Sequence, residues 1–329
     1  MTEEHRAEID AALTRVRHRP PFGFGRDDFP LPTTVALLAE VGEELENGLG
    51  AIRLRGLPVE RYSDDDIRRI FWGLGLHLGT PLHQNARGEI MGEVRDETRL
   101  DTKTYSETEP GRIVSSRARA RSTGPLRWHT DRCDVIALLC VRNAKAGGIS
   151  KLTSIVTIYN EILRRRPDLL TLLCQDYWRA RPADEDGIAS TRAFALPVFG
   201  VQDGKLTCQY SRTYVEQAQE FPEVPRITPA QNEALDLLAE VAEETCLHSP
   251  FVPGDIQLLN NHVVFHGRTA YEDDSASHQE RLLFRLWLSM PNSRRLPRGF
   301  DVLWGSTEPG AVRGGVVQPD TARRVAVAA

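Results

Sequence analysis

Residues with the chemistry of a metal site stand in two places, far apart in the chain. The stretch 127–131, Arg-Trp-His-Thr-Asp, holds His129 and Asp131, and the stretch 261–268 holds His266. Side chains two residues apart on a β-strand point to the same face, so one strand can present His129 and Asp131 together. Two imidazoles and one carboxylate on one face of a metal leave its other positions open, as in non-heme Fe(II) sites. We therefore predict that His129, Asp131 and His266 bind iron and form the catalytic centre.

The His-X-Asp pair by itself also fits simpler roles. His129 could be a hydrogen-bonded strand histidine, and Asp131 could be a turn or cap residue. Two histidines and one aspartate also match a zinc-dependent hydrolase, in which the metal activates a water molecule. A non-catalytic jelly-roll protein that binds a metal or a ligand is a third reading. His262 shares a predicted strand face with His266, and we expect it beside the site or at the surface rather than on the metal.

The last clearly patterned segment, residues 281–288, carries two arginines in an otherwise apolar strand. Period-two alternation places Arg281 and Arg285 on one face. The opposite face consists of large apolar side chains, namely Leu282, Phe284, Leu286 and Leu288. A guanidinium is costly to bury without an anionic partner, and its planar fork matches a carboxylate bidentately. The pattern indicates an anion site, and salt bridges at a sheet edge are the alternative.

The composition is that of an ordinary globular protein: 329 residues, of which 40% are apolar and 26% charged. A formal net charge of −5 argues against general nucleic-acid binding, which needs a basic face. No apolar run is long enough for a membrane span and no secretory signal follows the polar N-terminus, so we expect a cytoplasmic protein without a membrane partner. Five scattered cysteines without Cys-X-X-Cys spacing argue against a disulfide framework or structural zinc.

The elements that must position the candidate residues are mainly short strands. Helices are predicted before Pro20, from Pro32 to Leu45, after the N-cap Ser63, and at 159–165, 167–173 and 229–245. Strands are predicted at 51–56, 135–141, 150–157, 256–265 and 281–288, with a hairpin at 196–210 around Gln202-Asp203-Gly204.

This pattern predicts a mainly β fold with flanking helices (α+β), built as a sandwich or open barrel. We expect a single domain over residues 1–329. The polar segment 180–193 is expected to be a lid over the site. The chain is poor in pattern after Pro291, and its final residues are expected to be loosely ordered.

Four groups of residues occur in the same order as in a known enzyme family. They are Trp128-His129-Thr130-Asp131, then Gly147-Gly148 with Ser150 and the helix around Tyr159, then Asn261 with Phe265-His266-Gly267-Arg268, and last the strand with Arg281 and Arg285. In this combination the chain resembles the taurine catabolism dioxygenase (TauD/TfdA) family of Fe(II)/2-oxoglutarate-dependent oxygenases. The resemblance implies a double-stranded β-helix (jelly-roll) core and the use of Fe(II), 2-oxoglutarate and O2.

The resemblance also implies roles for individual residues. Arg281 would bind the C5 carboxylate of 2-oxoglutarate, helped by Ser150 at the position where the family commonly has threonine. Arg285 would lie near the C1 carboxylate or the substrate. Oxidative decarboxylation of 2-oxoglutarate would be coupled to hydroxylation of the substrate, or to desaturation or cyclisation. The carboxylate of Asp131 distinguishes the chain from related halogenases, which lack it.

The resemblance does not supply the substrate, because the polar residues that hold a sulfonate in taurine-acting members have no match here. Candidate substrate contacts are Gln84, Asn85, Tyr105, Arg127 and Arg212. Their character favours a small carboxylate-bearing or amino-acid-like molecule. The alternating basic run 117–121 is either a solvated strand face or a wall that attracts such an anion. The oligomeric state is left open, and a homo-oligomer is possible.

Overall fold

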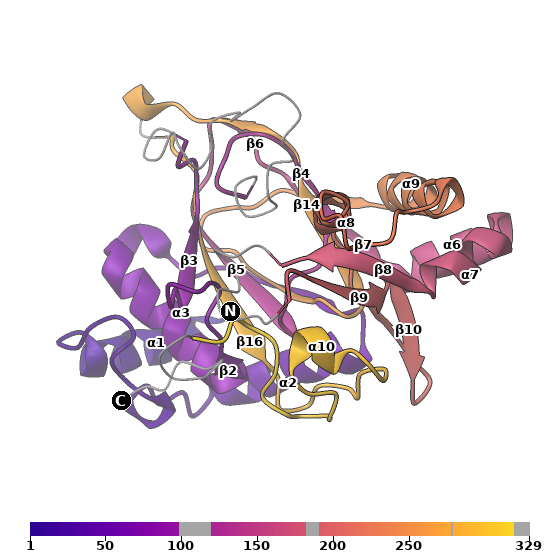
Figure 1. Cartoon of the computed structure of the whole chain (residues 1–329). Helices are drawn as coiled ribbons and strands as arrows, with labels where there is room; N and C mark the ends of the chain where they lie inside the picture. Colours follow the sequence, from indigo (N-terminus) through magenta and orange to yellow (C-terminus); the bar gives the residue numbers. More distant parts are fainter. Residues whose placement is uncertain (99–119, 182–190, 278, 319–329) are drawn as a thin grey trace.

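The computed structural model describes residues 1–98, 120–181, 191–277 and 279–318 (Figure 1). Two antiparallel sheets stand at its centre. Most of the predicted lid, Tyr105, the greater part of the basic run 117–121, and the last eleven or so residues of the chain lie outside the described residues. None of the described helices is both long enough and apolar enough to cross a membrane.

The larger sheet has six strands, and every neighbouring pair is antiparallel. Its order is β1 (Ala51–Leu54), β13 (Ile256–Asn260), β5 (Val135–Arg142), β16 (Leu282–Ser289) and β2 (Thr80–Pro81), with β3 (Met91–Val94) also paired to β16. Strands β5 and β16 are nearly continuous apolar runs, because both faces of each strand are covered.

The smaller sheet has four strands in the order β12 (Leu247–Ser249), β7 (Ser150–Ser154), β14 (Val264–Arg268) and β4 (Leu126–His129). Three two-stranded ribbons join β8 (Asp176–Ala180) to β9 (Ala193–Pro197), β10 (Phe199–Gln202) to β11 (Lys205–Cys208), and β6 (Ala146–Gly147) to β15 (Tyr271–Glu272). The predicted hairpin is the β10–β11 ribbon. It turns at Asp203 and Gly204, both at positive φ, as an Asp-Gly turn requires. The fold is thus mixed α/β with antiparallel sheets.

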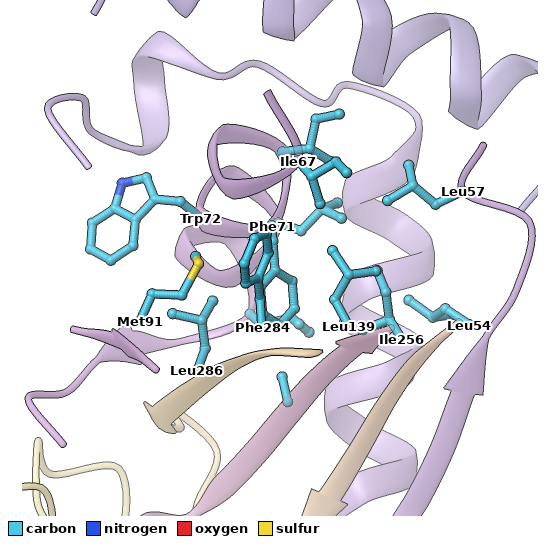
Figure 2. Close-up of a cluster of buried hydrophobic side chains, with 14 of the residues drawn as sticks. Leu54, Leu57, Ile67, Phe71, Trp72, Met91, Leu139, Ile256, Phe284 and Leu286 are labelled. Carbon is cyan, nitrogen blue, oxygen red and sulfur yellow. The ribbon is translucent and has the colours of Figure 1, made fainter. Parts of the chain in front are cut away.

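Three N-terminal helices cover the outer face of the larger sheet (Figure 1). They are α1 (Glu3–Val16), α2 (Thr34–Asn47) and α3 (Asp64–Leu78). Helix α3 begins where the Ser63 side chain accepts a hydrogen bond from the backbone N–H of Asp66, as its sequence predicts. The largest hydrophobic core lies between these helices and the sheet, and Figure 2 shows Phe71 of α3 facing Phe284 and Leu286 of β16.

A second group of helices packs beside the smaller sheet. It contains α6 (Ile155–Arg165), α7 (Pro167–Leu173) and α9 (Pro229–Glu244), whose apolar faces form a second core with the β10–β11 ribbon and Phe265. The shorter helices are α8 (Arg212–Ala218) and α10 (Asp301–Trp304), and 3-10 turns lie at Arg26–Asp28, Val59–Arg61 and Ser275–Ser277. A small apolar cluster bridges the two sheets, with Ile136 and Trp287 from the larger and Val264 from the smaller.

The predicted strand 256–265 is wrong, because the structure divides it between the two sheets. Strand β13 ends at Asn260, a turn follows, and β14 begins at Val264. The turn is closed by a hydrogen bond from the Val263 N–H to the Asn260 carbonyl at 3.1 Å. The prediction of strand through residue 157 is also wrong, since Ser154 ends β7 and caps α6.

The segment after Pro291 is packed as far as residue 318, contrary to its weak pattern. Trp304 and Arg313 are fully buried. The Arg313 Nε donates to Asp134 Oδ1 at 2.9 Å, and His262 Nε2 lies 2.8 Å from the same oxygen. His262 is therefore neither at the surface nor on a strand face with His266. It lies in the buried turn, where it contacts Asp134.

Candidate metal centre and adjoining cavities

The pairing of β4 with β14 brings the three predicted metal ligands together. In this register His266 lies opposite His129, although 137 positions separate them in the numbering of the chain. The prediction that one strand presents both His129 and Asp131 is wrong in part. Strand β4 ends at His129, so the following loop positions Asp131. The Nε2 of His129 lies 3.9 Å from Asp131 Oδ1, and the Nε2 of His266 lies 3.7 Å from Asp131 Oδ2. One potential ligand atom from each residue lies within 4.8 Å of the other two.

Hydrogen bonds orient two of the three side chains. The Nδ1 of His129 lies 2.9 Å from the carbonyl oxygen of Arg127, which makes Nδ1 the protonated nitrogen and leaves the Nε2 lone pair toward Asp131. The Asp131 N–H donates to Asn261 Oδ1 at 2.9 Å, and Trp287 Nε1 donates to Asp131 Oδ2 at 3.2 Å. The Nδ1 of His266 is buried without a partner among the described residues.

The electrostatics favour the protonation states that a metal requires. Burial alone would raise the pKa of Asp131, but the charge of Arg285, with smaller contributions from the adjacent histidines and the Trp287 hydrogen bond, holds the pKa below the ordinary value. Burial lowers the pKa of His266 to about 3, and the neighbouring His129 adds to the effect. A carboxylate and neutral imidazoles are the forms that coordinate metals, so this donor set fits a divalent iron ion.

A cavity with about 460 Å³ of empty space lies on one side of the triad, between the two sheets. Arg281 and Ser150 both line it and are both buried. The Arg281 guanidinium lies over the Tyr271 ring, 5.3 Å from its centroid, and forms no ion pair with a carboxylate of the described residues. Gly148, at φ +67°, leaves it room: a Cβ there would lie 3.0 Å from Arg281 Nε. A buried guanidinium without an anion suits a carboxylate ligand.

Arg285 stands where this cavity meets a larger one. Its Nε donates to Gln84 Oε1 at 2.7 Å, and the Gln84 Nε2 donates back to the Arg285 carbonyl at 2.8 Å. Its guanidinium lies 5.3 Å from the Trp287 ring centroid. Arg285, His129 and Asp131 line both cavities, so the candidate metal position separates the two.

The larger cavity has about 860 Å³ of empty space, including its open mouth, which is the size of a small-molecule site. Several residues of its wall were missed by sequence reasoning: Arg132, Arg181, Phe194, Gln209, Tyr214, Leu303 and Val316. They come from the loop after β4, the chain around the β8–β9 ribbon, the segment from β11 into α8, and the C-terminal segment. No local motif marks them, although the position of Arg132 next to Asp131 was an available signal.

The predicted substrate contacts have different positions. Gln84 lines the larger cavity. The side chain of Asn85 instead accepts hydrogen bonds from the backbone N–H of Arg87 and of Glu89, a turn-forming role. Arg127 and Arg212 both pair with Glu216 and line a separate hollow, so the structure does not bring them to the cavity. Tyr105 lies outside the described residues.

Comparison with known proteins gives one family and several relatives. The model of the taurine catabolism dioxygenase TauD, TfdA family matches residues 15–287. The FR-33289 synthase of Streptomyces rubellomurinus is 32% identical over 93% of this chain and 89% of its own length. The taurine hydroxylase-like protein SAT17 of Stachybotrys chartarum is 30% identical, over 87% of this chain and 73% of its own.

Solved structures share the fold at low identity. An asparagine oxygenase in complex with Fe(II), (2S,3S)-3-hydroxyasparagine and succinate has a TM-score of 0.66 and 16% identity, over 88% of this chain and 92% of that one. The non-heme iron oxygenase OrfP in complex with Fe and alpha-ketoglutaric acid has a TM-score of 0.63 and 15% identity, over 88% of this chain and 92% of that one. The shared fold agrees with the family match.

Proposed function

Since the chain belongs to the taurine catabolism dioxygenase (TauD, TfdA) family and is an Fe(II)/2-oxoglutarate-dependent dioxygenase that uses O2, we propose that it oxidises a C–H bond of a small anionic molecule. We assign the iron to His129, Asp131 and His266. The observation that carries this assignment is the convergence of their ligand atoms from two paired elements of the chain. We also propose that the two central sheets form the double-stranded β-helix core of the family.

The chemistry supplied by the bound group is the oxidation itself: ferrous iron with 2-oxoglutarate and O2 provides the oxidant, and 2-oxoglutarate becomes succinate. The chain holds and shields the reactants. Asn261 holds the backbone N–H of Asp131, and Trp287 holds its carboxylate. The contact with the Arg127 carbonyl orients the ring of His129. These contacts hold the open face of the triad toward the two cavities.

The smaller cavity is assigned to 2-oxoglutarate. Three arginines line it. The Arg268 side chain donates to backbone carbonyls and the Arg285 side chain donates to Gln84. The Arg281 side chain has only a long contact, 3.5 Å from Nη1 to the Val94 carbonyl, and no carboxylate partner among the described residues. We assign the C5 carboxylate to Arg281 and Ser150. The Ser150 hydroxyl accepts from Gln257 Nε2 at 3.0 Å, which leaves its own proton to donate to the carboxylate.

The larger cavity is assigned to the substrate. Arg285 and Gln84 line it beside the triad, which supports a carboxylate-bearing or amino-acid-like substrate with its anionic group near Arg285. The structures of relatives with hydroxyasparagine or hydroxyarginine are consistent with a molecule of this size. Hydroxylation is the proposed outcome, with desaturation or cyclisation as variants of the same C–H oxidation. A zinc hydrolase would leave Arg281 without a role.

The test is a screen of small carboxylates, N-acylated amino acids and sulfonates for compounds that stimulate conversion of 2-oxoglutarate to succinate. A positive compound must raise succinate formation only with Fe(II) and O2 present, and its product must gain oxygen or lose hydrogen by mass spectrometry. Equal activity with Zn(II) under nitrogen would contradict the proposal.

A further inference from the structure

The wall of the larger cavity contains a buried side-chain amide whose oxygen is unpaired within the part of the chain that the structure describes. Gln209 lines this cavity and is 5% exposed, yet its Oε1 has no hydrogen-bond partner among the described residues. An unpaired buried carbonyl oxygen costs roughly as much as a lost hydrogen bond, so such groups are rare unless a ligand satisfies them. The roles proposed above for Arg285, Gln84 and the triad do not use this amide.

The backbone of Gln209 is held firmly on both sides. Its N–H donates to the Val198 carbonyl at 3.0 Å. Its own carbonyl accepts from Nη2 of Arg179 at 2.9 Å, and Arg179 is a fully buried residue of β8. The side chain therefore projects from a fixed point, which is what a selective contact requires.

The same segment is joined to the residues that carry the candidate metal ligands. Ser211 forms an antiparallel bridge with His129. The Thr130 N–H donates to the Tyr210 carbonyl at 2.9 Å, and the Tyr210 N–H donates to Thr130 Oγ1 at 3.1 Å. Gln209 lies two residues before Ser211 and lines the same cavity as His129 and Asp131. A group held by Gln209 would thus lie at a set position relative to the metal.

We infer that Gln209 is a specificity-determining residue that accepts a hydrogen bond from a neutral amide N–H of the substrate. The inference rests on the substrate role proposed for this cavity. The partner of Oε1 must be a hydrogen-bond donor, because Oε1 can only accept. An amide is favoured over an ammonium because Arg285 repels a cation, and Asp131, a candidate metal ligand, is the only carboxylate among the described residues that line the cavity.

Matched probes separate the amide from the anion. Binding is measured by calorimetry on protein loaded with Fe(II) and 2-oxoglutarate under nitrogen, with N-acetyl-β-alanine, β-alanine and 3-acetoxypropanoate. The third probe replaces the N–H with an ester oxygen. We expect the amide to bind about tenfold more tightly than either other probe, as befits one hydrogen bond to a buried acceptor. N-acetyltaurine and taurine repeat the comparison with a sulfonate.

Two variants assign the preference to this residue. Gln209→Met keeps the length of the side chain but removes the amide, and should bring the three affinities within about threefold of one another. Gln202→Met is the matched control at the β10–β11 turn, where Gln202 Nε2 donates to Asp203, and should keep the preference. Thermal midpoints check that both variants fold. An absent amide preference in the wild type, or one that survives in Gln209→Met, overturns the inference. Binding of 2-oxoglutarate and turnover with another substrate would then leave the proposed function standing.

Discussion

Single side chains decide whether the metal is held, because an open triad has no spare protein ligand. We expect His129→Ala, Asp131→Ala and His266→Ala each to abolish turnover and to lower the bound iron well below one equivalent. The measurements are succinate formation and iron content after gel filtration. His18→Ala, at an exposed histidine just after α1, is the control and should keep both. Full activity of purified His266→Ala would rule out the assignment.

Arg281 provides a second prediction at this scale. Arg281→Lys keeps the charge but loses the planar fork, so it should weaken 2-oxoglutarate binding. Arg281→Ala should weaken it more, by about 1.5–3 kcal/mol or roughly 10- to 200-fold, since a charged hydrogen bond is lost. Ser150→Ala should cost about 1 kcal/mol, because it removes one neutral donor.

The measurement is titration of anaerobic Fe(II) protein with 2-oxoglutarate, followed by charge-transfer absorption. Iron binding itself should survive all three changes, because none removes a metal ligand. Arg142→Ala, at an exposed arginine that pairs with Asp64, should bind like the wild type. If Arg285→Ala loses binding while Arg281→Ala does not, the roles of the two arginines are exchanged.

At the scale of elements, the loop after β4 must hold Asp131 in place, because the strand ends at His129. Trp287 of β16 reaches across from the larger sheet to donate to this carboxylate. Trp287→Phe keeps an aromatic ring but removes the indole N–H, so iron affinity should fall about 10- to 100-fold, the usual effect of losing a partner of a metal ligand.

Fe(II) competition with a chelator measures that affinity. Trp178→Phe, at a half-exposed position of β8, is the matched control and should leave the affinity unchanged. Unchanged iron affinity in Trp287→Phe would mean that Asn261 and the loop backbone alone orient Asp131.

At the scale of the whole molecule, the C-terminal segment is tied to the metal loop through the interior. Asp134 accepts from Arg313 Nε and from the Met290 N–H, and contacts His262. Arg313→Met would leave a buried carboxylate with less compensating charge, so we expect a loss of about 3 kcal/mol of unfolding free energy.

Urea unfolding followed by tryptophan fluorescence measures this loss. Arg295→Met, at a part-exposed arginine that pairs with Glu308, is the control and should change stability little. A stability loss in Arg313→Met no larger than in this control would show that the C-terminal segment does not support the fold through Asp134.

The sequence alone determined the features that depend on local chemistry. Helices α3, α7 and α9 begin at the predicted caps and prolines, since capping depends on residues three or four apart. The Asp-Gly turn of the β10–β11 ribbon and the alternation along β16 are local for the same reason. The family resemblance could be seen in the sequence because its motifs are short and occur in a fixed order. The family model, which matches residues 15–287, confirms it.

Only the tertiary structure decided how distant segments share one site. The local sequence of residues 256–265 predicts one strand, but it does not show that the chain changes sheets at Asn261, because that depends on which strands pair. The tertiary structure paired Arg127 with Glu216 instead of bringing it to the cavity, and it brought Ser211 beside His129. Such positions follow from contacts between residues tens to hundreds of positions apart, which no local pattern encodes.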